Sequence, residues 1–143
     1  MRKYSFILLI IAFVSCVMRN KTTDNLNNPD ARKFFDLAVH CQYKGELDSA
    51  LYFYNASYEL CPNSSVILNE RGMLKFSMND YKGALIEMNK AIELSPNENE
   101  KQIRTYNRAL IYLSQNKIDS ACMDWKNSGK WGKGNLKKYC GKE

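Results

Sequence analysis

A repeated alanine is the feature of this 143-residue sequence that most restricts its fold. Ala84 lies 34 residues after Ala50, and Ala121 follows after a further 37. The segments around these alanines align without gaps and read KGELDSALYFYNASYELCPN, MNDYKGALIEMNKAIELSPN and QNKIDSACMDWKNS. A period of this length indicates a repeated pair of helices. The longer second interval indicates a three-residue insertion, which we place in NENEKQ.

The sizes of the neighbouring side chains keep the same register. A large apolar residue stands four positions after each alanine, and small residues stand seven after it and twelve before it. These are, in the same order, Tyr54, Met88 and Trp125; Ser57, Ala91 and Ser128; and Ala38, Gly72 and Ala109. Antiparallel helices approach closely only where side chains are small, while large neighbours fill the gaps. A single pair cannot bury its apolar face, so we expect the pairs to stack.

In period, register and the closing prolines Pro62 and Pro96, residues 31–128 resemble the tetratricopeptide repeat (TPR). The resemblance implies an all-α fold, an α-solenoid of about three TPR helix–turn–helix pairs followed by a C-terminal capping helix. The expected parts are the pairs 31–64, 65–98 and 102–128 and the cap 129–143.

The N-terminus predicts export. Arg2 and Lys3 precede an apolar run at residues 6–14, which is shorter than the roughly 20 residues of a membrane-spanning helix. FVSC then resembles the lipobox of bacterial lipoproteins, with Phe13 replacing the usual Leu. The resemblance implies that residues 1–15 are a signal peptide and that Cys16 carries lipid. The alternative is an ordinary signal peptide in which Cys16 is incidental.

Lipidation would place the protein on a membrane of the cell envelope, because each buried methylene contributes about 0.8 kcal/mol. Residues 16–29 are rich in Asn and Thr and predict a flexible tether between Cys16 and the repeats. VMRN after Cys16 lacks an acidic run that would indicate surface export, so we expect a protein that faces the periplasm.

The C-terminal tail predicts the cap. Gly129, Gly132 and Gly134 are expected to break the helix, and NLKKYC predicts a short final helix. The tail ACMDWKNSGKWGKGNLKKYC resembles that of small repeat proteins of the Bacteroidetes type, which carry one cysteine after the second-helix alanine and another near the C-terminus. We transfer this pattern to Cys122 and Cys140 and expect them to form a disulfide.

With Cys16 assigned to lipid, the other four cysteines allow three pairings. The expected cap helix doubles back, so Cys140 could reach Cys122 in the first turn of the last repeat helix. Cys41 and Cys61 fall at opposite ends of one helical pair, so we expect both to be buried thiols.

In the TPR family, the first helix of each pair lines a concave groove. The residues that this register assigns to a peptide-binding groove are mostly apolar: Phe35, Val39, Asn69, Met73, Phe76, Ile103, Tyr106 and Leu110. Some members of the family hold a peptide carboxylate with Lys and Asn, but the equivalent positions here are Phe35, Val39, Glu70, Ile103 and Asn107. We therefore expect contacts through apolar and amide groups. Alternatively, the tether or a second copy of the chain covers part of this surface.

No pattern indicates an enzyme, a metal site or a cofactor. The sequence has no CxxC, HExxH or glycine-rich phosphate loop. His40 and Cys41 are adjacent, but neighbours on a helix point about 100° apart, which does not suit a catalytic dyad. We therefore expect no catalytic residue, no metal and no cofactor.

The formal net charge of +6 falls to +4 once Arg2 and Lys3 are removed, and the excess lies in a lysine-rich C-terminal end. Such a run could attract anionic lipid or an acidic partner, although a solvated helix face is the interpretation we favour. Export and the lack of an arginine-rich stripe argue against nucleic acid. The leading hypothesis is a lipid-anchored scaffold that binds a protein or peptide, and the second is an accessory envelope lipoprotein that only self-associates.

Overall fold

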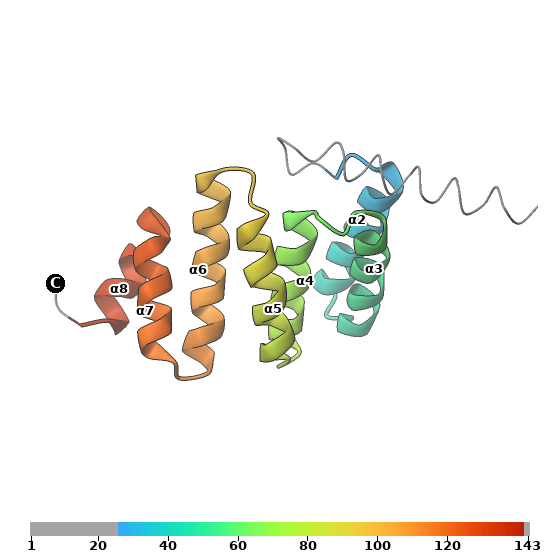
Figure 1. The fold of residues 1–143 in the computed structure, drawn as a ribbon. Helices are drawn as coiled ribbons and strands as arrows, with labels where there is room; N and C mark the ends of the chain where they lie inside the picture. Colours follow the sequence, from blue (N-terminus) through green and yellow to red (C-terminus); the bar gives the residue numbers. More distant parts are fainter. Residues whose placement is uncertain (1–25, 142–143) are drawn as a thin grey trace, which may run out of the picture. The chain divides into compact units, whose positions relative to one another are not determined.

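The computed structural model describes residues 26–141, which form seven α-helices and one short 3-10 helix, with no strand in that range. In chain order they are α2 (Pro29–Tyr43), α3 (Leu47–Leu60), α4 (Ser65–Ser77), α5 (Tyr81–Glu93), α6 (Glu98–Ser114), α7 (Ile118–Asn127), η1 (Gly129–Trp131) and α8 (Lys133–Tyr139) (Figure 1). The predicted all-α fold is confirmed. The predicted signal peptide and Cys16 lie outside the described residues.

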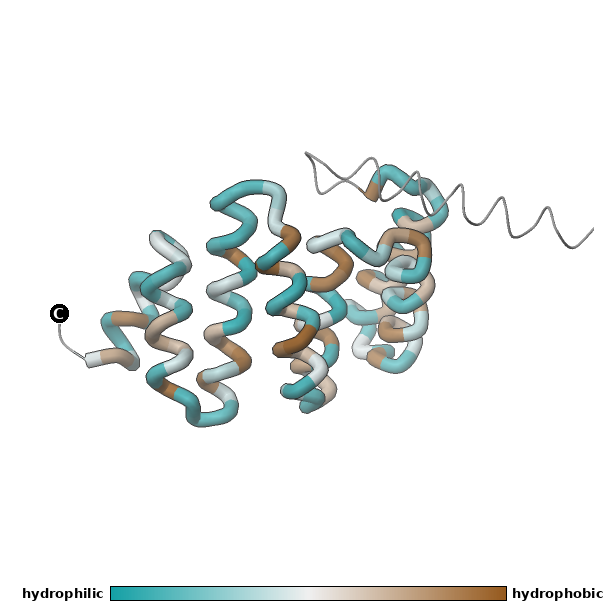
Figure 2. Tube along the Cα trace, viewed as in Figure 1, coloured by the Kyte–Doolittle hydropathy of each residue, from teal (hydrophilic) through white to brown (hydrophobic). Residues whose placement is uncertain are grey.

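The chain divides into two compact units, one ending at Ile67 and one beginning at Leu68, and each is described by itself. Hydrophilic and hydrophobic residues are interspersed along the helices (Figure 2), as expected for helices that bury one side. Among residues 26–141, no helix combines the length and the apolar character that crossing a bilayer requires.

The predicted repeat register is visible in the burial of side chains. The shared alanines Ala50, Ala84 and Ala121 are fully buried, and so are the large residues four positions later, Tyr54, Met88 and Trp125. The small residues expected at the helix crossings are also buried; these are Ala38, Gly72, Ala109, Ser57, Ala91 and Ser128. Each helical pair therefore packs about the positions that the alignment selected.

The turn inside each pair also repeats. Gly45, Asn79 and Asn116 occupy equivalent positions and have φ of 78°, 63° and 58°. A left-handed residue just after a helix lets the chain reverse, and Gly and Asn adopt this conformation at the lowest cost. These three residues explain why the two helices of each pair are antiparallel.

In the first unit, α2 packs against α3. Asn28 begins α2 because its side-chain oxygen accepts hydrogen bonds from the backbone N–H groups of Asp30 and Ala31. The core contains Ala31, Cys61 and Ile67, with Leu26 and other partly buried residues around it. The hydroxyl of Ser57 donates a hydrogen bond of 2.8 Å to the carbonyl of Ala31, which fixes the crossing of the two helices.

In the second unit, α5 packs against α6, and α6 against α7. Helix α6 begins at Glu98, so the residues predicted as an insertion form an additional turn at its N-terminus rather than a loop. Asn97 caps this turn by accepting the N–H of Glu100. The added turn places Glu100 one turn from Arg104, and the two side chains form an ion pair of 2.7 Å.

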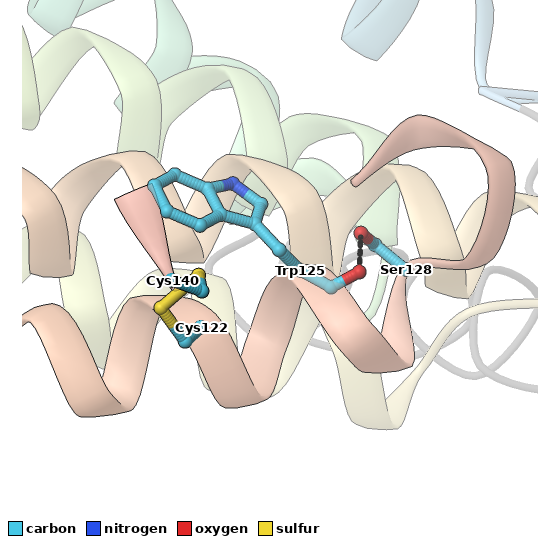
Figure 3. The surroundings of a disulfide bond; sticks show 4 residues. All are labelled: Cys122, Trp125, Ser128 and Cys140. Carbon is cyan, nitrogen blue, oxygen red and sulfur yellow. Dashed lines mark hydrogen bonds between the residues drawn. A yellow bond between two sulfur atoms is a disulfide. The ribbon is translucent and has the colours of Figure 1, made fainter. Parts of the chain in front are cut away.

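The C-terminal cap packs on the third helical pair. Helix α8 begins at Lys133, so Gly134 lies inside it and does not break it as the sequence analysis expected. Cys122 and Cys140 form a disulfide with their Cα atoms 5.7 Å apart, which ties the end of α8 to the start of α7 (Figure 3). This is the pairing that the sequence predicted. Cys41 and Cys61 are buried and take no part in this bond.

Candidate peptide-binding face

The two predicted groove residues of the first unit differ in environment. Phe35 packs on the core cluster of that unit, and its ring lies 5.6 Å from the ring of Tyr54 in an edge-to-face arrangement. Val39, one turn further along α2, is 43% exposed. Phe35 therefore contributes to folding, whereas Val39 is accessible to a ligand.

The predicted residues on α4 contribute to the second unit. Met73 and Phe76 are partly buried against the cluster of Ala84, Met88 and Ile111. Phe76 also lies 6.0 Å from the ring of Tyr81. These two side chains serve the packing of α4 and α5 and offer only part of their surface to a partner.

Tyr106 and Leu110 on α6 pack on the core cluster that the cap also contacts. Both are partly buried against the cluster of Ala109, Ala121 and Trp125, which also packs against Leu136 and Cys140 of the cap. Asn135 of α8 donates a hydrogen bond of 3.3 Å to the hydroxyl of Tyr106. The cap therefore covers part of the surface that the sequence assigned to the groove. Ile103, one turn before Asn107, is half-buried.

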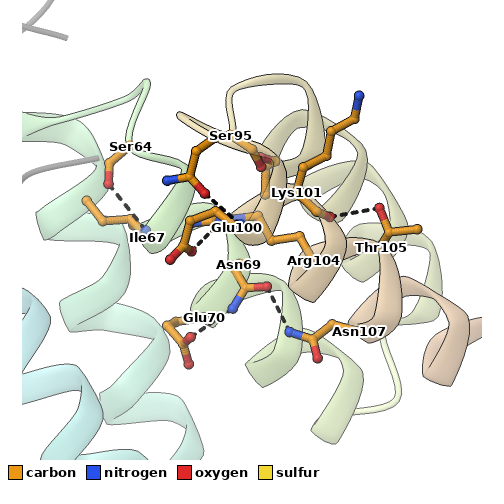
Figure 4. Close-up of polar contacts among 12 residues, drawn as sticks. Ser64, Ile67, Asn69, Glu70, Ser95, Glu100, Lys101, Arg104, Thr105 and Asn107 are labelled. Atoms are coloured by element: carbon orange, nitrogen blue, oxygen red, sulfur yellow. Dashed lines mark hydrogen bonds and ion pairs between the residues drawn. The ribbon is translucent and has the colours of Figure 1, made fainter. Parts of the chain in front are cut away.

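A pair of asparagines joins α4 to α6 between these residues. Nδ2 of Asn107 donates to Oδ1 of Asn69 over 3.0 Å, and Nδ2 of Asn69 donates to Glu70 over 2.8 Å (Figure 4). The residues of the second unit that surround this pair by helical spacing form what we call the α4–α6 face. They are Asn69, Glu70, Met73, Ile103, Tyr106 and Asn107.

The chemistry of the α4–α6 face follows from these contacts. Asn107 uses only its nitrogen in the bond to Asn69, so its Oδ1 can accept a hydrogen bond from the N–H of a bound chain. Glu70 adds a negative charge beside the asparagines. The face can thus bind backbone amides and apolar side chains, but it repels a carboxylate.

Sequence reasoning missed two ion pairs that recur at one register. Arg71 binds both carboxylate oxygens of Glu87 at 2.7 and 2.9 Å, and Lys75 binds the same carboxylate at 2.9 Å. In the next pair, Arg108 binds both oxygens of Asp124 at 2.7 Å. Each arginine stands 13 residues before the shared alanine and each acid three after it. An alignment of the second and third repeats contains this signal. The first repeat does not share it, because it has Leu37 and Phe53 at these two positions.

Arg108 lies at a pocket of about 340 Å³ formed by α5, α6 and α7, on residues outside the α4–α6 face. The hydrogen bonds that Arg108 donates to Asp124 raise the pKa of Arg108 above its ordinary value. A third bond, of 2.7 Å, runs from Arg108 to Asn89. Because this guanidinium is already neutralised and bonded, the pocket is not suited to an anion.

The described residues contain no cluster of three or more His, Cys, Asp or Glu side chains that could hold a metal ion. His40 is exposed whereas Cys41 is buried, so the two adjacent side chains do not share one site. The geometry of this pair does not provide a nucleophile and its base.

Comparison with known proteins agrees with this architecture. Residues 66–98 match the tetratricopeptide repeat family. A curated relative, the tetratricopeptide repeat protein 36 homolog of Drosophila melanogaster, is 30% identical over 100 residues, which cover 66% of this chain and 52% of that protein. The chain thus spans about half the length of the curated relative it matches.

Two solved structures have the same fold. The first TPR of Spaghetti (RPAP3), solved with the HSP90 peptide SRMEEVD, has a TM-score of 0.68 and 17% identity and is matched over 80% of this chain and 93% of its own. The Sgt2 TPR domain of Aspergillus fumigatus has a TM-score of 0.68 and 13% identity, over 85% of this chain and 81% of its own. The repeat match and the two structures together support a tetratricopeptide-repeat fold for this chain.

Proposed function

We propose that this protein is a lipid-anchored interaction module of a bacterial cell envelope, which faces the periplasm and holds a peptide or protein partner on its α4–α6 face. The observation that carries the binding proposal is the bonded pair Asn69 and Asn107, in which the half-buried Asn107 offers its Oδ1 to a bound chain between apolar neighbours. Helical repeats use such extended surfaces for partners. We assign no catalytic activity.

The ligand we propose is an apolar segment without an essential C-terminal carboxylate. The structure of the Spaghetti (RPAP3) TPR contains a peptide that ends in Asp. In this chain Glu70 lies next to Asn69, and a peptide carboxylate placed there would meet a like charge. Met73, Ile103 and Tyr106 supply the adaptable apolar contacts.

Peptide display tests the binding proposal. Random peptides with free and with blocked C-termini would be selected on the purified full-length chain. We expect both libraries to yield apolar ligands whose affinity changes little between about 0.1 and about 0.5 M salt, because charges contribute little to such contacts. Asn107→Arg should weaken binding about ten-fold or more. The matched control Asn99→Arg, on the exposed first turn of α6, should leave it unchanged.

Two results would contradict this assignment. One is a strict requirement for a free carboxylate, which Glu70 should prevent. The other is a set of ligands that bind Asn107→Arg as tightly as the wild type, which would place their site elsewhere.

The anchor is tested separately. Cells supplied with an alkyne-bearing fatty acid should label the wild-type chain, and Cys16→Ser should abolish the label and either release the protein into the soluble fraction or leave it unprocessed. Cys41→Ser should keep the label. A Cys16→Ser chain that remains on membranes after cleavage at the same bond would exclude the lipid anchor.

One observation favours self-association as a second function. The residue two positions after each shared alanine is large, apolar and exposed: Tyr52 is 68%, Ile86 61% and Met123 64% exposed. A second copy of the chain could cover Ile86 and Met123, which belong to the same unit. Sedimentation velocity decides this point. A wild-type dimer that becomes monomeric with Ile86→Lys and Met123→Lys, but not with Asn127→Lys, would support it, and a monomer at all concentrations would exclude it.

A further inference from the structure

Over its described residues, 129–141, the cap is a basic surface without acidic residues; Lys142 and Glu143, whose charges cancel, follow in the sequence. Residues 125–141 contain five lysines and no Asp or Glu, and all five lysines are exposed: Lys126, Lys130, Lys133, Lys137 and Lys138. On α7, against which α8 packs, Asp124 is buried and bonded to Arg108, so it does not neutralise this charge. Asp119 is the other acidic residue of α7 and is exposed in its first turn.

Helix α8 presents its lysines together. Successive helical residues differ by about 100°, so Lys133, Lys137 and Lys138 fall within about 140° of arc. Leu136 falls about 60° outside this arc, and both Leu136 and Cys140 pack on the core of the third helical pair. The helix therefore buries its apolar side in the protein and turns a nearly continuous cationic side to solvent.

Two exposed aromatic rings accompany the lysines. Trp131 is 43% exposed, and Nζ of Lys130 lies 5.1 Å from the centre of its ring. Tyr139 is 37% exposed, and Nζ of Lys138 lies 4.7 Å from the centre of its ring. Trp and Tyr next to cationic side chains suit the headgroup level of a bilayer, where an amphipathic ring contacts both lipid and water.

The cap is held in place before any ligand binds. The disulfide from Cys122 to Cys140 closes a segment of 18 residues, Asn135 bonds to Tyr106, and the ring of Tyr139 stacks on Trp125 at 5.5 Å. A fixed surface loses less conformational entropy on docking than a flexible basic tail.

We propose that this cap surface, formed by Lys130, Trp131, Lys133, Lys137 and Lys138, docks onto a bilayer that contains anionic phospholipid. Charge complementarity supplies the attraction, since each lysine near such a surface contributes about a five-fold gain in binding. The aromatic pair favours a bilayer over an acidic protein, because exposed Trp and Tyr rings beside cationic side chains are typical of the bilayer–water interface. The proposal goes beyond the lipid anchor, and it holds whether or not Cys16 is acylated.

Fluorescence quenching by brominated lipids tests the docking. The chain has two tryptophans; Trp125 is fully buried, so Trp131 is the residue that a quencher in lipid can reach. The full-length chain would be reconstituted into vesicles of phosphatidylcholine, with or without phosphatidylglycerol. We expect quenching only in the anionic vesicles and its loss at high salt. Trp131→Phe should remove the quenched component.

Matched lysine variants locate the surface. Lys130, Lys133, Lys137 and Lys138 changed together to Gln should lower the ratio of docked to undocked cap by about five-fold for each lysine, or at least about a hundred-fold in total. The control changes Lys33, Lys44, Lys82 and Lys101 to Gln, which are exposed and alter the net charge equally. The control should quench like the wild type.

Three outcomes would overturn the proposal. They are equal quenching in neutral and anionic vesicles, equal loss in both lysine variants, and no quenching in either vesicle, as expected if the lysines bind an acidic protein instead. None of them bears on the label carried by Cys16, so the failure of the docking surface and the failure of the anchor are distinguishable.

Discussion

Asn107 of α6 and Asn69 of α4 share a side-chain hydrogen bond of 3.0 Å, which joins the first helices of two successive pairs. Asn69 is 8% exposed and uses its nitrogen on Glu70 as well, so its amide is bonded at both ends. A buried amide that loses one partner keeps its desolvation cost. The pair therefore contributes to stability as well as to the α4–α6 face.

A double-mutant cycle measures this relationship. Asn69→Ala and Asn107→Ala should each lower the free energy of unfolding by about 1 kcal/mol, and Asn69→Ala by the larger amount because it also removes the bond to Glu70. The double variant should lose less than the sum of the two, with a coupling energy of about 0.5 to 1.5 kcal/mol from urea unfolding. Strict additivity would show that the bond does not form in solution.

A second prediction concerns the contribution of the disulfide to stability. Changing Cys122 and Cys140 to Ser should lower stability by about 3 kcal/mol in the chain-entropy model for a loop of this size. The loss should appear first as faster amide hydrogen exchange in α8, since this short helix depends on its packing. A reductant should destabilise the wild type and leave the double variant unchanged. Mapping that found Cys41 linked to Cys61 would contradict the assignment.

A third prediction concerns the buried carboxylate of Glu87 and its two cations in the second helical pair. Glu87 is 7% exposed and binds both Arg71 and Lys75, so Glu87→Leu leaves two cations without their carboxylate. We expect a loss of about 3 to 5 kcal/mol in the free energy of unfolding. Glu93→Leu, at an exposed position of the same helix, should change it by less than about 0.5 kcal/mol. Similar losses in both variants would mean that the pair is solvated.

These examples show where sequence reasoning succeeds. The shared alanines and the large residues after them recur at fixed positions, and antiparallel helices need small residues where they cross and large ones beside them, so the register predicts these core positions. The tail resemblance likewise selected Cys122 and Cys140. Such features depend on residue size and on local spacing, which the sequence contains.

Other features depend on tertiary contacts. The repeat register assigns Tyr106 to an open groove, yet Asn135 of the cap donates a hydrogen bond to its hydroxyl. No local pattern states which surface of α6 a downstream helix will cover. The bonds from Arg71 to Glu87 and from Arg108 to Asp124 join residues 16 positions apart on facing helices. They become visible in sequence only when the repeats are superposed.

The last prediction concerns two glycines of the cap. The sequence gives no reason to distinguish them, but their surroundings in the structure differ. A Cβ added at Gly132 would overlap the backbone carbonyl of Trp125 and lie 2.6 Å from Oγ of Ser128. A Cβ at Gly134 would meet nothing within 4 Å, and this residue lies inside α8. The first glycine permits a close approach of two chain segments, whereas the second only weakens a helix.

Alanine at each position should therefore have opposite effects. Gly134→Ala should stabilise the protein by about 0.5 to 1 kcal/mol, because alanine loses less backbone entropy in a helix. Gly132→Ala should destabilise it by about 1 to 3 kcal/mol, because the overlapping atom belongs to the backbone of α7 and can move only if the helix end moves. Thermal unfolding and hydrogen exchange of α8 would measure both changes with the disulfide intact. Equal effects of the same sign would show that the cap does not pack at Trp125 and Ser128 as the structure has it.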